Sequence, residues 1–102
     1  MYAVARINTF NPDRLAAAAH DVGEFDARHT AQPGYVARIV IDLEPSRQLV
    51  VNVWESEEHS RAGREALGPQ AQRLLNPLMT EPSDFIGAGP ASLQIKHGHR
   101  LP

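Results

Sequence analysis

The amino-acid sequence predicts an α+β domain in which an antiparallel sheet carries its helices on one face. Three observations predict this fold class. Residues 48–54 are rich in β-branched side chains and pass directly into Ser56, which can cap the start of a helix. An apolar stripe at helical spacing follows an earlier β-rich segment. A short turn at Pro45 separates two segments of strand character, as in an antiparallel hairpin.

The first half of the chain is predicted to form one strand and one helix. Residues 2–10 supply β-forming side chains, and Asn11-Pro12 marks a helix start because Asn caps well and Pro fits the first helical position. The apolar face of this helix has a spacing of three and four residues: Leu15, Ala18, Val22, Phe25 and His29. Pro33-Gly34 ends the element.

The second half is predicted to form a hairpin, a helix and a last strand. Residues 35–43 and 48–54 form the hairpin, and a helix begins near Glu57. Gly68-Pro69 predicts a break in that helix with a fresh start at Pro69. Residues 84–95 form the last strand. The order is βαββαβ, a ferredoxin-like domain over residues 1–95, with a flexible tail at 96–102.

Each predicted strand has one nearly pure apolar side and one mixed side. In residues 35–43, Tyr35 shares the apolar side with Ala37, Ile39, Ile41 and Leu43. The simplest arrangement places the mixed sides of all strands on one face of the sheet, toward the helices, where they would line a pocket. The residues expected on this face are Arg6, Asn8, Arg38, Asn52 and Trp54. The other face is then bare, and a second copy of the chain is its simplest cover.

Composition restricts the classes of partner. The 102 residues contain no cysteine, which excludes disulfides, thiolate metal sites and a cysteine nucleophile. The formal net charge of -2 gives no broad basic field for nucleic acid or an anionic membrane. With no signal peptide and no apolar run of transmembrane length, a cytoplasmic location is expected. His97-Gly98-His99 lacks a third ligand, so no metal site is expected.

Several mixed-face and helix residues are candidates for chemistry. Asn8 and Asn52 could hydrogen-bond a substrate carbonyl or phenolate, or satisfy backbone groups instead. His29 could accept a substrate proton, or pack as a neutral core histidine. His59 could face the mouth of the pocket, and Trp54 is predicted to form its wall.

The role of two arginines on the mixed face has two interpretations. Arg6 and Arg38 could bind a substrate carboxylate, or pair with Asp42 and Glu55 at the sheet rim. The interpretation as salt bridges is favoured.

Three segments carry a resemblance to a known family: ARINTF at 5–10, PGYVAR at 33–38 and VVNVWESEEH at 50–59. At this spacing and in this βαββαβ order, the chain resembles the antibiotic-biosynthesis-monooxygenase-like proteins of the dimeric α+β barrel superfamily. The resemblance covers residues 2–95. It implies a homodimer whose two sheets face each other as a barrel. The family includes cofactor-independent oxygenases of aromatic or quinol substrates, haem-degrading enzymes and members without a known reaction.

The haem-degrading branch of that family uses an Asn on the first strand, a Trp on the second helix and a His further on. Asn8 matches the first position, but Gly63 and Gln72 stand at the other two. His59 lies too early on the helix to replace the missing histidine. Haem degradation is therefore not expected, and haem binding without turnover is a minor alternative.

The resemblance implies a cofactor-independent monooxygenase acting on a small aromatic, phenolic or quinol substrate. Asn8, Arg38, Asn52 and Trp54 would bind the substrate, and His29 or His59 would assist proton transfer. The alternative is a non-catalytic ligand-binding or stress-associated dimer with the same pocket. A titratable side chain on the pocket floor would favour catalysis, and an entirely apolar lining would favour binding alone.

Overall fold

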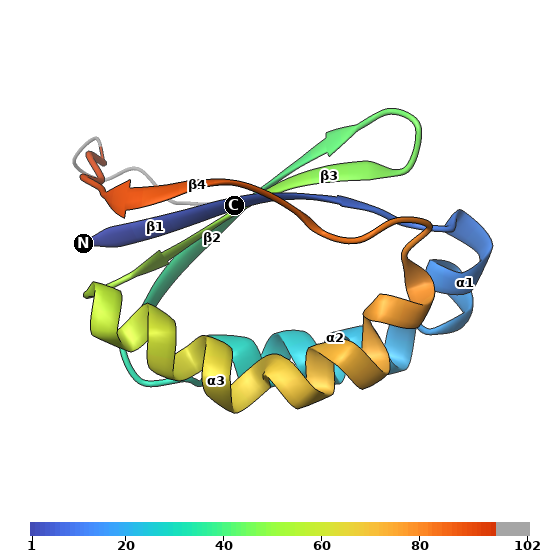
Figure 1. Ribbon diagram of the computed structural model, residues 1–102, viewed down its shortest axis with the longest axis horizontal. Coiled ribbons are helices and arrows are strands. Elements are labelled where there is room, and N and C mark those ends of the chain that lie inside the picture. The colour runs from blue at the N-terminus through green and yellow to red at the C-terminus, as the bar shows by residue number, and fades with distance from the viewer. Residues whose placement is uncertain (96–102) are drawn as a thin grey trace.

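The computed structural model describes residues 1–95, in which four strands and three helices follow the predicted order, with two helices in place of the first predicted one (Figure 1). The predicted tail at 96–102 lies outside the described residues. The elements are β1 (Tyr2–Thr9), α1 (Pro12–Ala17), α2 (Ala19–Thr30), β2 (Tyr35–Leu43), β3 (Arg47–Trp54), α3 (Glu57–Leu74), the 3-10 turn η1 (Asn76–Leu78) and β4 (Asp84–Pro90).

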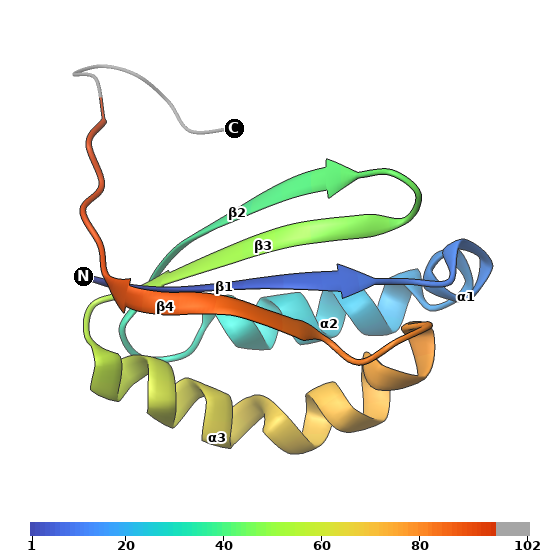
Figure 2. The same cartoon turned by 45° about the horizontal axis from the view of Figure 1, so that its top comes forward.

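The sheet has the strand order β2-β3-β1-β4, and each neighbouring pair is antiparallel (Figure 2). This topology confirms the predicted ferredoxin-like fold. The helices α2 and α3 lie on one face of the sheet, here called the inner face, and the opposite side is the outer face (Figure 1). The register aligns like side chains across strands: Leu49 lies opposite both Ile7 and Ile41, and Val50 lies opposite Val40.

Both helix starts have the predicted caps. The Asn11 side chain accepts a hydrogen bond from the Arg14 backbone N–H at 3.0 Å, and the Ser56 hydroxyl accepts one from the His59 N–H at 3.1 Å. The first helix is interrupted at Ala18, whose ψ of 18° departs from helical geometry, so that two helices replace the single one expected.

The predicted break at Gly68-Pro69 is wrong, because α3 runs without interruption from Glu57 to Leu74. The residue before a proline avoids the helical conformation partly because its Cβ meets the proline ring, and Gly68 has no Cβ. The carbonyl that loses its partner to Pro69 belongs to Glu65, which is exposed to water. One continuous helix therefore spans the sheet.

A register shift near the start of β2 changes the face of one aromatic residue. Tyr35 lies opposite Trp54, whereas Ala37 lies opposite Val53, so Val36 is an extra residue in the ladder. Tyr35 thereby joins the inner face with Trp54, and the prediction that it shares the face of Ala37 is wrong.

The last strand is shorter than predicted, since β4 ends at Pro90 rather than at residue 95. Proline has no N–H to donate to the sheet and commonly ends a strand.

The buried apolar residues include Phe10, Phe25, Trp54 and Leu67, which lie between the inner face and the helices. On the outer face, by contrast, Ile39 and Ile41 are 49% and 47% exposed. Within residues 1–95, no helix combines the length and apolar character needed to cross a bilayer. The cytoplasmic location stays a prediction.

Candidate functional site

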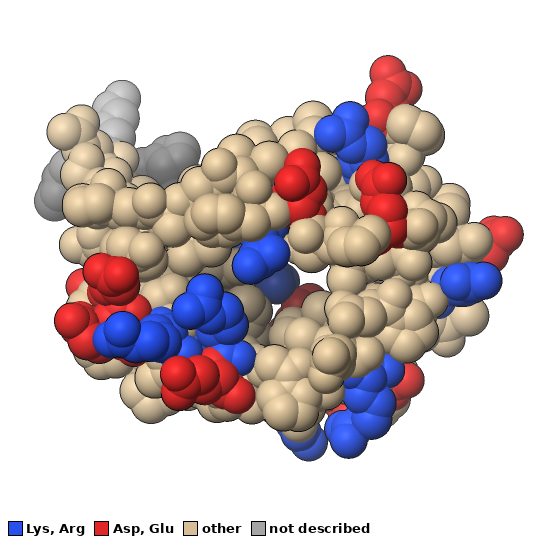
Figure 3. Space-filling model, in the orientation of Figure 1, with Lys and Arg blue, Asp and Glu red and all other residues tan. Residues whose placement is uncertain are grey.

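A cavity of ≈ 690 Å³ lies between the inner face of the sheet and helices α2 and α3. Figure 3 shows its opening as a hollow with positively charged side chains above it and to its left. A volume of this size accommodates a small organic ligand of several rings.

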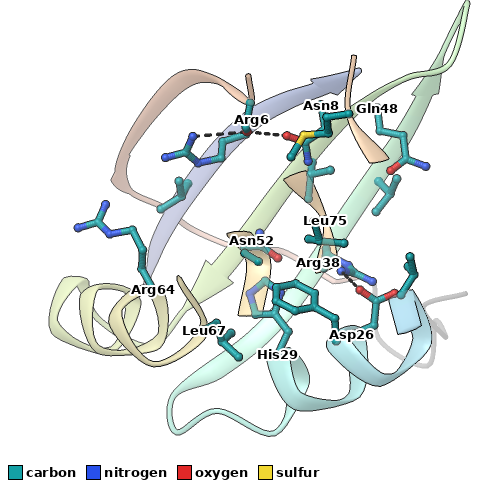
Figure 4. Close-up of a pocket in the computed structure, with 18 of the residues that line it drawn as sticks. Arg6, Asn8, Asp26, His29, Arg38, Gln48, Asn52, Arg64, Leu67 and Leu75 are labelled. Atoms are coloured by element: carbon teal, nitrogen blue, oxygen red, sulfur yellow. Dashed lines mark hydrogen bonds and ion pairs between the residues drawn. The ribbon is translucent and has the colours of Figure 1, made fainter. Parts of the chain in front are cut away.

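The predicted mixed face exists as a single surface. Five residues expected there line the same cavity: Arg6, Asn8, Arg38, Asn52 and Trp54. They come together because alternate residues of a strand share a face, and the register places Arg38 directly opposite Asn52. Figure 4 shows how the four polar side chains of this set and the helix residues His29, Asp26 and Arg64 surround the same space.

One end of the cavity has an aromatic wall. The His29 ring centroid lies 5.2 Å from that of Tyr35, 5.7 Å from that of Trp54 and 5.8 Å from that of Phe25. Tyr35 and Trp54 are themselves 5.3 Å apart in an edge-on arrangement. Such spacings are typical of attractive aromatic pairs, and they fix the orientation of the imidazole.

Trp54 is 3% exposed and occupies the space above a glycine of α3. A Cβ placed on Gly63 would lie 2.4 Å from the far edge of the indole ring, well inside contact distance. The helix can therefore carry no side chain at this position while the indole stays where it is.

His29 combines burial with an unsatisfied ring nitrogen. Burial lowers the pKa of its imidazole below 6.5, and the nearby Arg38 guanidinium lowers it further, against a smaller opposing effect of Asp26. The ring is therefore neutral at pH 7. Its Nδ1 atom is buried and has no hydrogen-bond partner among the described residues. A neutral imidazole can accept a proton, and because His29 lines the cavity, a small turn of its ring would present this nitrogen to a bound molecule.

Arg38 forms a salt bridge that differs from the predicted one. Its Nη1 donates to Asp26 Oδ1 at 2.9 Å, which joins β2 to α2 and raises the pKa of the guanidinium. The expected partner Asp42 instead accepts a hydrogen bond from Gln48 at 3.2 Å. Four residues along a strand span about 13 Å, too far for Arg38 and Asp42 to meet.

Arg6 and Asn8 are both attached to the segment that precedes β4. The Ser83 hydroxyl donates to Asn8 Oδ1 at 2.5 Å and accepts a weak hydrogen bond from Arg6 at 3.5 Å. The Arg6 guanidinium also lies 5.4 Å from the centre of the Phe85 ring, within range of a cation–π interaction. Within residues 1–95, Arg6 has no carboxylate partner.

Two further polar atoms near the aromatic wall have no partner in the described part of the chain. They are Asn52 Oδ1 and the Tyr35 hydroxyl, both buried. Leaving such a group unpaired costs about 1–3 kcal/mol, so a buried orphan calls for an explanation. Asn52 lines the cavity, so a ligand that shifts its amide slightly could supply the missing hydrogen bond to Oδ1.

His59 does not line the cavity, and its expected place at the pocket mouth is wrong. Its Nδ1 lies 2.7 Å from the Ser56 hydroxyl at the start of α3. Its ring also packs against Gly34, which has a φ of 78° and whose Cβ would lie 2.2 Å from that ring. These contacts direct the imidazole toward the β2 turn.

The sequence did not point to three polar side chains of the cavity, Asp26, Gln48 and Arg64, or to Tyr35, which packs behind its aromatic wall. Tyr35 was assigned to the other face because the register shift is invisible in the alternation. Asp26 and Arg64 resemble the ordinary solvent-facing charges of an amphipathic helix. A signal did exist for Asp26, since it stands between Phe25 and His29 on the same side of α2.

No group of three or more metal-ligating side chains comes together in the part of the chain that the structure describes. The histidines at 97 and 99 fall outside that part.

No protein-family model and no curated protein sequence matches the chain. Solved structures do match. A candidate antibiotic biosynthesis monooxygenase from Nitrosomonas europaea superimposes with a TM-score of 0.72 at 15% identity, over 89% of this chain and 98% of its own. SnoaB, a cofactor-independent oxygenase from Streptomyces nogalater solved as a variant, superimposes with a TM-score of 0.70 at 18% identity. The match covers 92% of this chain and 95% of SnoaB. The chain has the fold of the antibiotic-biosynthesis-monooxygenase proteins.

A conserved protein from Methanosarcina mazei has the same fold, with a TM-score of 0.73 at 11% identity over 89% of this chain and 92% of its own. At these identities the likeness concerns the fold. Within this antibiotic-biosynthesis-monooxygenase fold, the two departures from the haem-degrading pattern have clear positions. Gly63 lies beneath the Trp54 ring, and Gln72 is exposed on α3 outside the cavity lining.

Proposed function

We propose that this protein is a cofactor-independent monooxygenase that acts on a small aromatic, phenolic or quinol compound bound in the cavity between sheet and helices. One observation carries the proposal: a neutral imidazole, His29, whose Nδ1 is buried without a partner beside an aromatic wall and a guanidinium. The shared fold with a cofactor-independent oxygenase supports the reaction class.

The cavity offers separate features for the ring and for the hydroxyl of such a substrate. Trp54 and Phe25 present apolar surface against which a ring can pack. Asn52 Oδ1 can accept a hydrogen bond from a hydroxyl, and Arg38 stabilises the anion that remains when that hydroxyl is deprotonated. Asp26 uses one of the five N–H donors of Arg38 and holds the guanidinium in place. Asn8, held by Ser83, would bind a second polar group of the substrate.

For a phenol with a hydrogen at the reacting ring carbon, the overall reaction converts phenol and O₂ into quinone and water. His29 accepts the phenolic proton, the phenolate gives one electron to O₂, and the resulting radical pair forms a C–O bond. The imidazolium returns its proton to the peroxide. When the imidazole then removes the ring hydrogen as a proton, the O–O bond breaks, the second carbonyl forms, and hydroxide leaves with that proton as water.

A second copy of the chain is proposed to cover the outer face. Ile39 and Ile41 lie in register with other apolar residues of β3 and β1 and are about half exposed. A contiguous apolar face of this kind is typical of a protein interface. With like faces opposed, the pair would form a closed homodimer.

Binding without catalysis is the alternative for the same cavity. The presence of His29 in the lining favours catalysis, because a neutral imidazole of lowered pKa can take up a substrate proton. The expected absence of a cofactor stays a prediction.

Oxygen consumption by metal-free protein, measured against a panel of quinols and polycyclic phenols, tests the proposal. We expect His29→Gln to lower kcat by about 100-fold or more, the usual contribution of a general base. Asn8→Ala should raise KM. His20→Gln is the matched control, because His20 lies on the same helix, exposed and paired with Glu24.

Circular dichroism establishes that each variant is folded. Oxygen uptake that His29→Gln leaves unchanged would contradict the assigned role. Thermal stabilisation by the panel without any uptake would establish the binding protein instead.

A further inference from the structure

We infer that Arg6 and Arg64 form an anion subsite at the mouth of the cavity, so that the ligand is an aromatic acid whose carboxylate lies between them. The inference uses the cavity of the proposed function and names the class of its substrate. It requires binding only, and oxygen chemistry plays no part in it.

The charges of the cavity lining do not balance. Three guanidinium groups line it, Arg6, Arg38 and Arg64, against the single carboxylate of Asp26. Asp26 is already engaged with Arg38. Arg6 and Arg64 therefore leave an excess of positive charge in a chain whose overall formal charge is -2. Such a local excess attracts an anionic ligand.

The two free guanidinium groups come from opposite walls. Arg6 extends from β1 on the sheet side, and Arg64 from α3 on the helix side. Figure 4 shows both directed toward one end of the cavity, away from the Arg38–Asp26 pair. Neither forms a salt bridge within residues 1–95. An oxyanion between them would receive charge-assisted hydrogen bonds from both walls.

Arg6 is held in position before any ligand arrives. It is half-buried, and Ser83 and the Phe85 ring contact its guanidinium. Fixing a long side chain in advance reduces the entropy lost on binding. Arg64 is exposed and supplies the second charge from the rim.

The chemical class of the ligand follows from what lies between the two ends. The aromatic wall of Phe25, His29 and Trp54 is one end of the same cavity, and apolar side chains such as Val4 and Leu67 line the space toward the arginines. A ring system seated on the wall would thus carry its acidic group toward the mouth. Arginine pairs preferentially with planar carboxylates, which it can bind with two parallel hydrogen bonds.

Equilibrium binding of anthracene-2-carboxylate and its neutral analogue anthracene-2-carboxamide, followed by probe fluorescence at low salt, tests the inference. We expect the wild-type protein to bind the acid about tenfold or more tightly than the amide. Arg6→Gln and Arg64→Gln should each remove most of that preference and leave amide binding unchanged. Arg61→Gln is the matched control, because Arg61 is exposed on α3 and does not line the cavity.

Equal affinity of the wild-type protein for acid and amide would overturn the anion subsite while leaving the aromatic cavity and its proposed activity intact. The subsite would also be overturned if Arg61→Gln reduced the preference for the acid over the amide as much as Arg64→Gln does. Binding of neither probe would overturn both the subsite and the cavity's role as an aromatic site. Inorganic phosphate that displaces the acid but not the amide would support the subsite.

Discussion

The two faces of the sheet depart from the pattern of an ordinary single-layer sheet, which buries apolar side chains and exposes polar ones. The inner face, covered by helices, carries Arg6, Asn8, Arg38 and Asn52. The outer face carries aliphatic residues in register across β2, β3 and β1, with Ile41 among the most exposed.

This difference is the basis for proposing a ligand for the inner face and a packing partner for the outer face. Polar groups kept under helices are costly unless something satisfies them, and Asn52 and His29 each leave an atom unpaired there. Apolar groups left in water are costly unless something covers them. The proposed ligand would satisfy the inner face, and the proposed second chain would cover the outer face.

The largest expected effect is on the inner face. Trp54→Ala should lower the free energy of unfolding by about 3–5 kcal/mol, because it removes a nearly fully buried ring and leaves a cavity. Phe85→Ala, a truncation of an aromatic residue that is 55% exposed, should cost about 1 kcal/mol or less. Urea denaturation followed by far-ultraviolet circular dichroism measures both, and equal losses would contradict the placement of the core.

The outer face is tested by a charge on its edge strand β2. Ile41→Glu should weaken self-association by about 100-fold or more, because an unpaired carboxylate would be buried in the interface. Sedimentation equilibrium measures the dissociation constant. Ala66→Glu, on the exposed side of α3, should leave it unchanged. A variant that remains as dimeric as the parent would place the interface elsewhere.

The close approach of α3 to the sheet is tested at two glycines. Gly63→Ala should destabilise the protein by about 1–3 kcal/mol, because its methyl group meets the Trp54 ring. Gly23→Ala should stabilise it by up to about 1 kcal/mol, since nothing lies within 4 Å of the added Cβ on α2. Thermal and urea unfolding measure both. A Gly63→Ala variant as stable as Gly23→Ala would contradict the position of the indole.

The smallest expected effect is a dependence of stability on pH. The folded pKa of His29 is lowered below 6.5, so the unfolded chain binds a proton more readily between the two values. The stability from the neutral imidazole is present above pH 6.5 and is lost as pH falls toward the folded pKa. Urea unfolding at several pH values should show that the free energy of unfolding depends less steeply on pH in His29→Gln than in His20→Gln. Identical slopes would mean that the imidazole is not desolvated.

Much of this structure could be predicted from short-range patterns. The Asn11 and Ser56 caps depend on a side chain bonding a backbone N–H three residues on, so their positions are visible in the sequence. The mixed face was equally predictable, since strand alternation alone places Arg6 with Asn8 and Asn52 with Trp54. What could not be predicted depends on a partner distant in sequence. Nothing local indicates that Arg38 reaches Asp26 on α2, or that Val36 adds a residue to its strand.

The sequence by itself determined the order of elements, the helix starts and the two unlike sides of each strand, because these depend on residues a few positions apart. Only the tertiary structure decided that Tyr35 lies inside and His59 outside, and that Arg64 shares a cavity with Arg6. Register and helix position set those distances, and both arise from the packing of the whole sheet against α2 and α3.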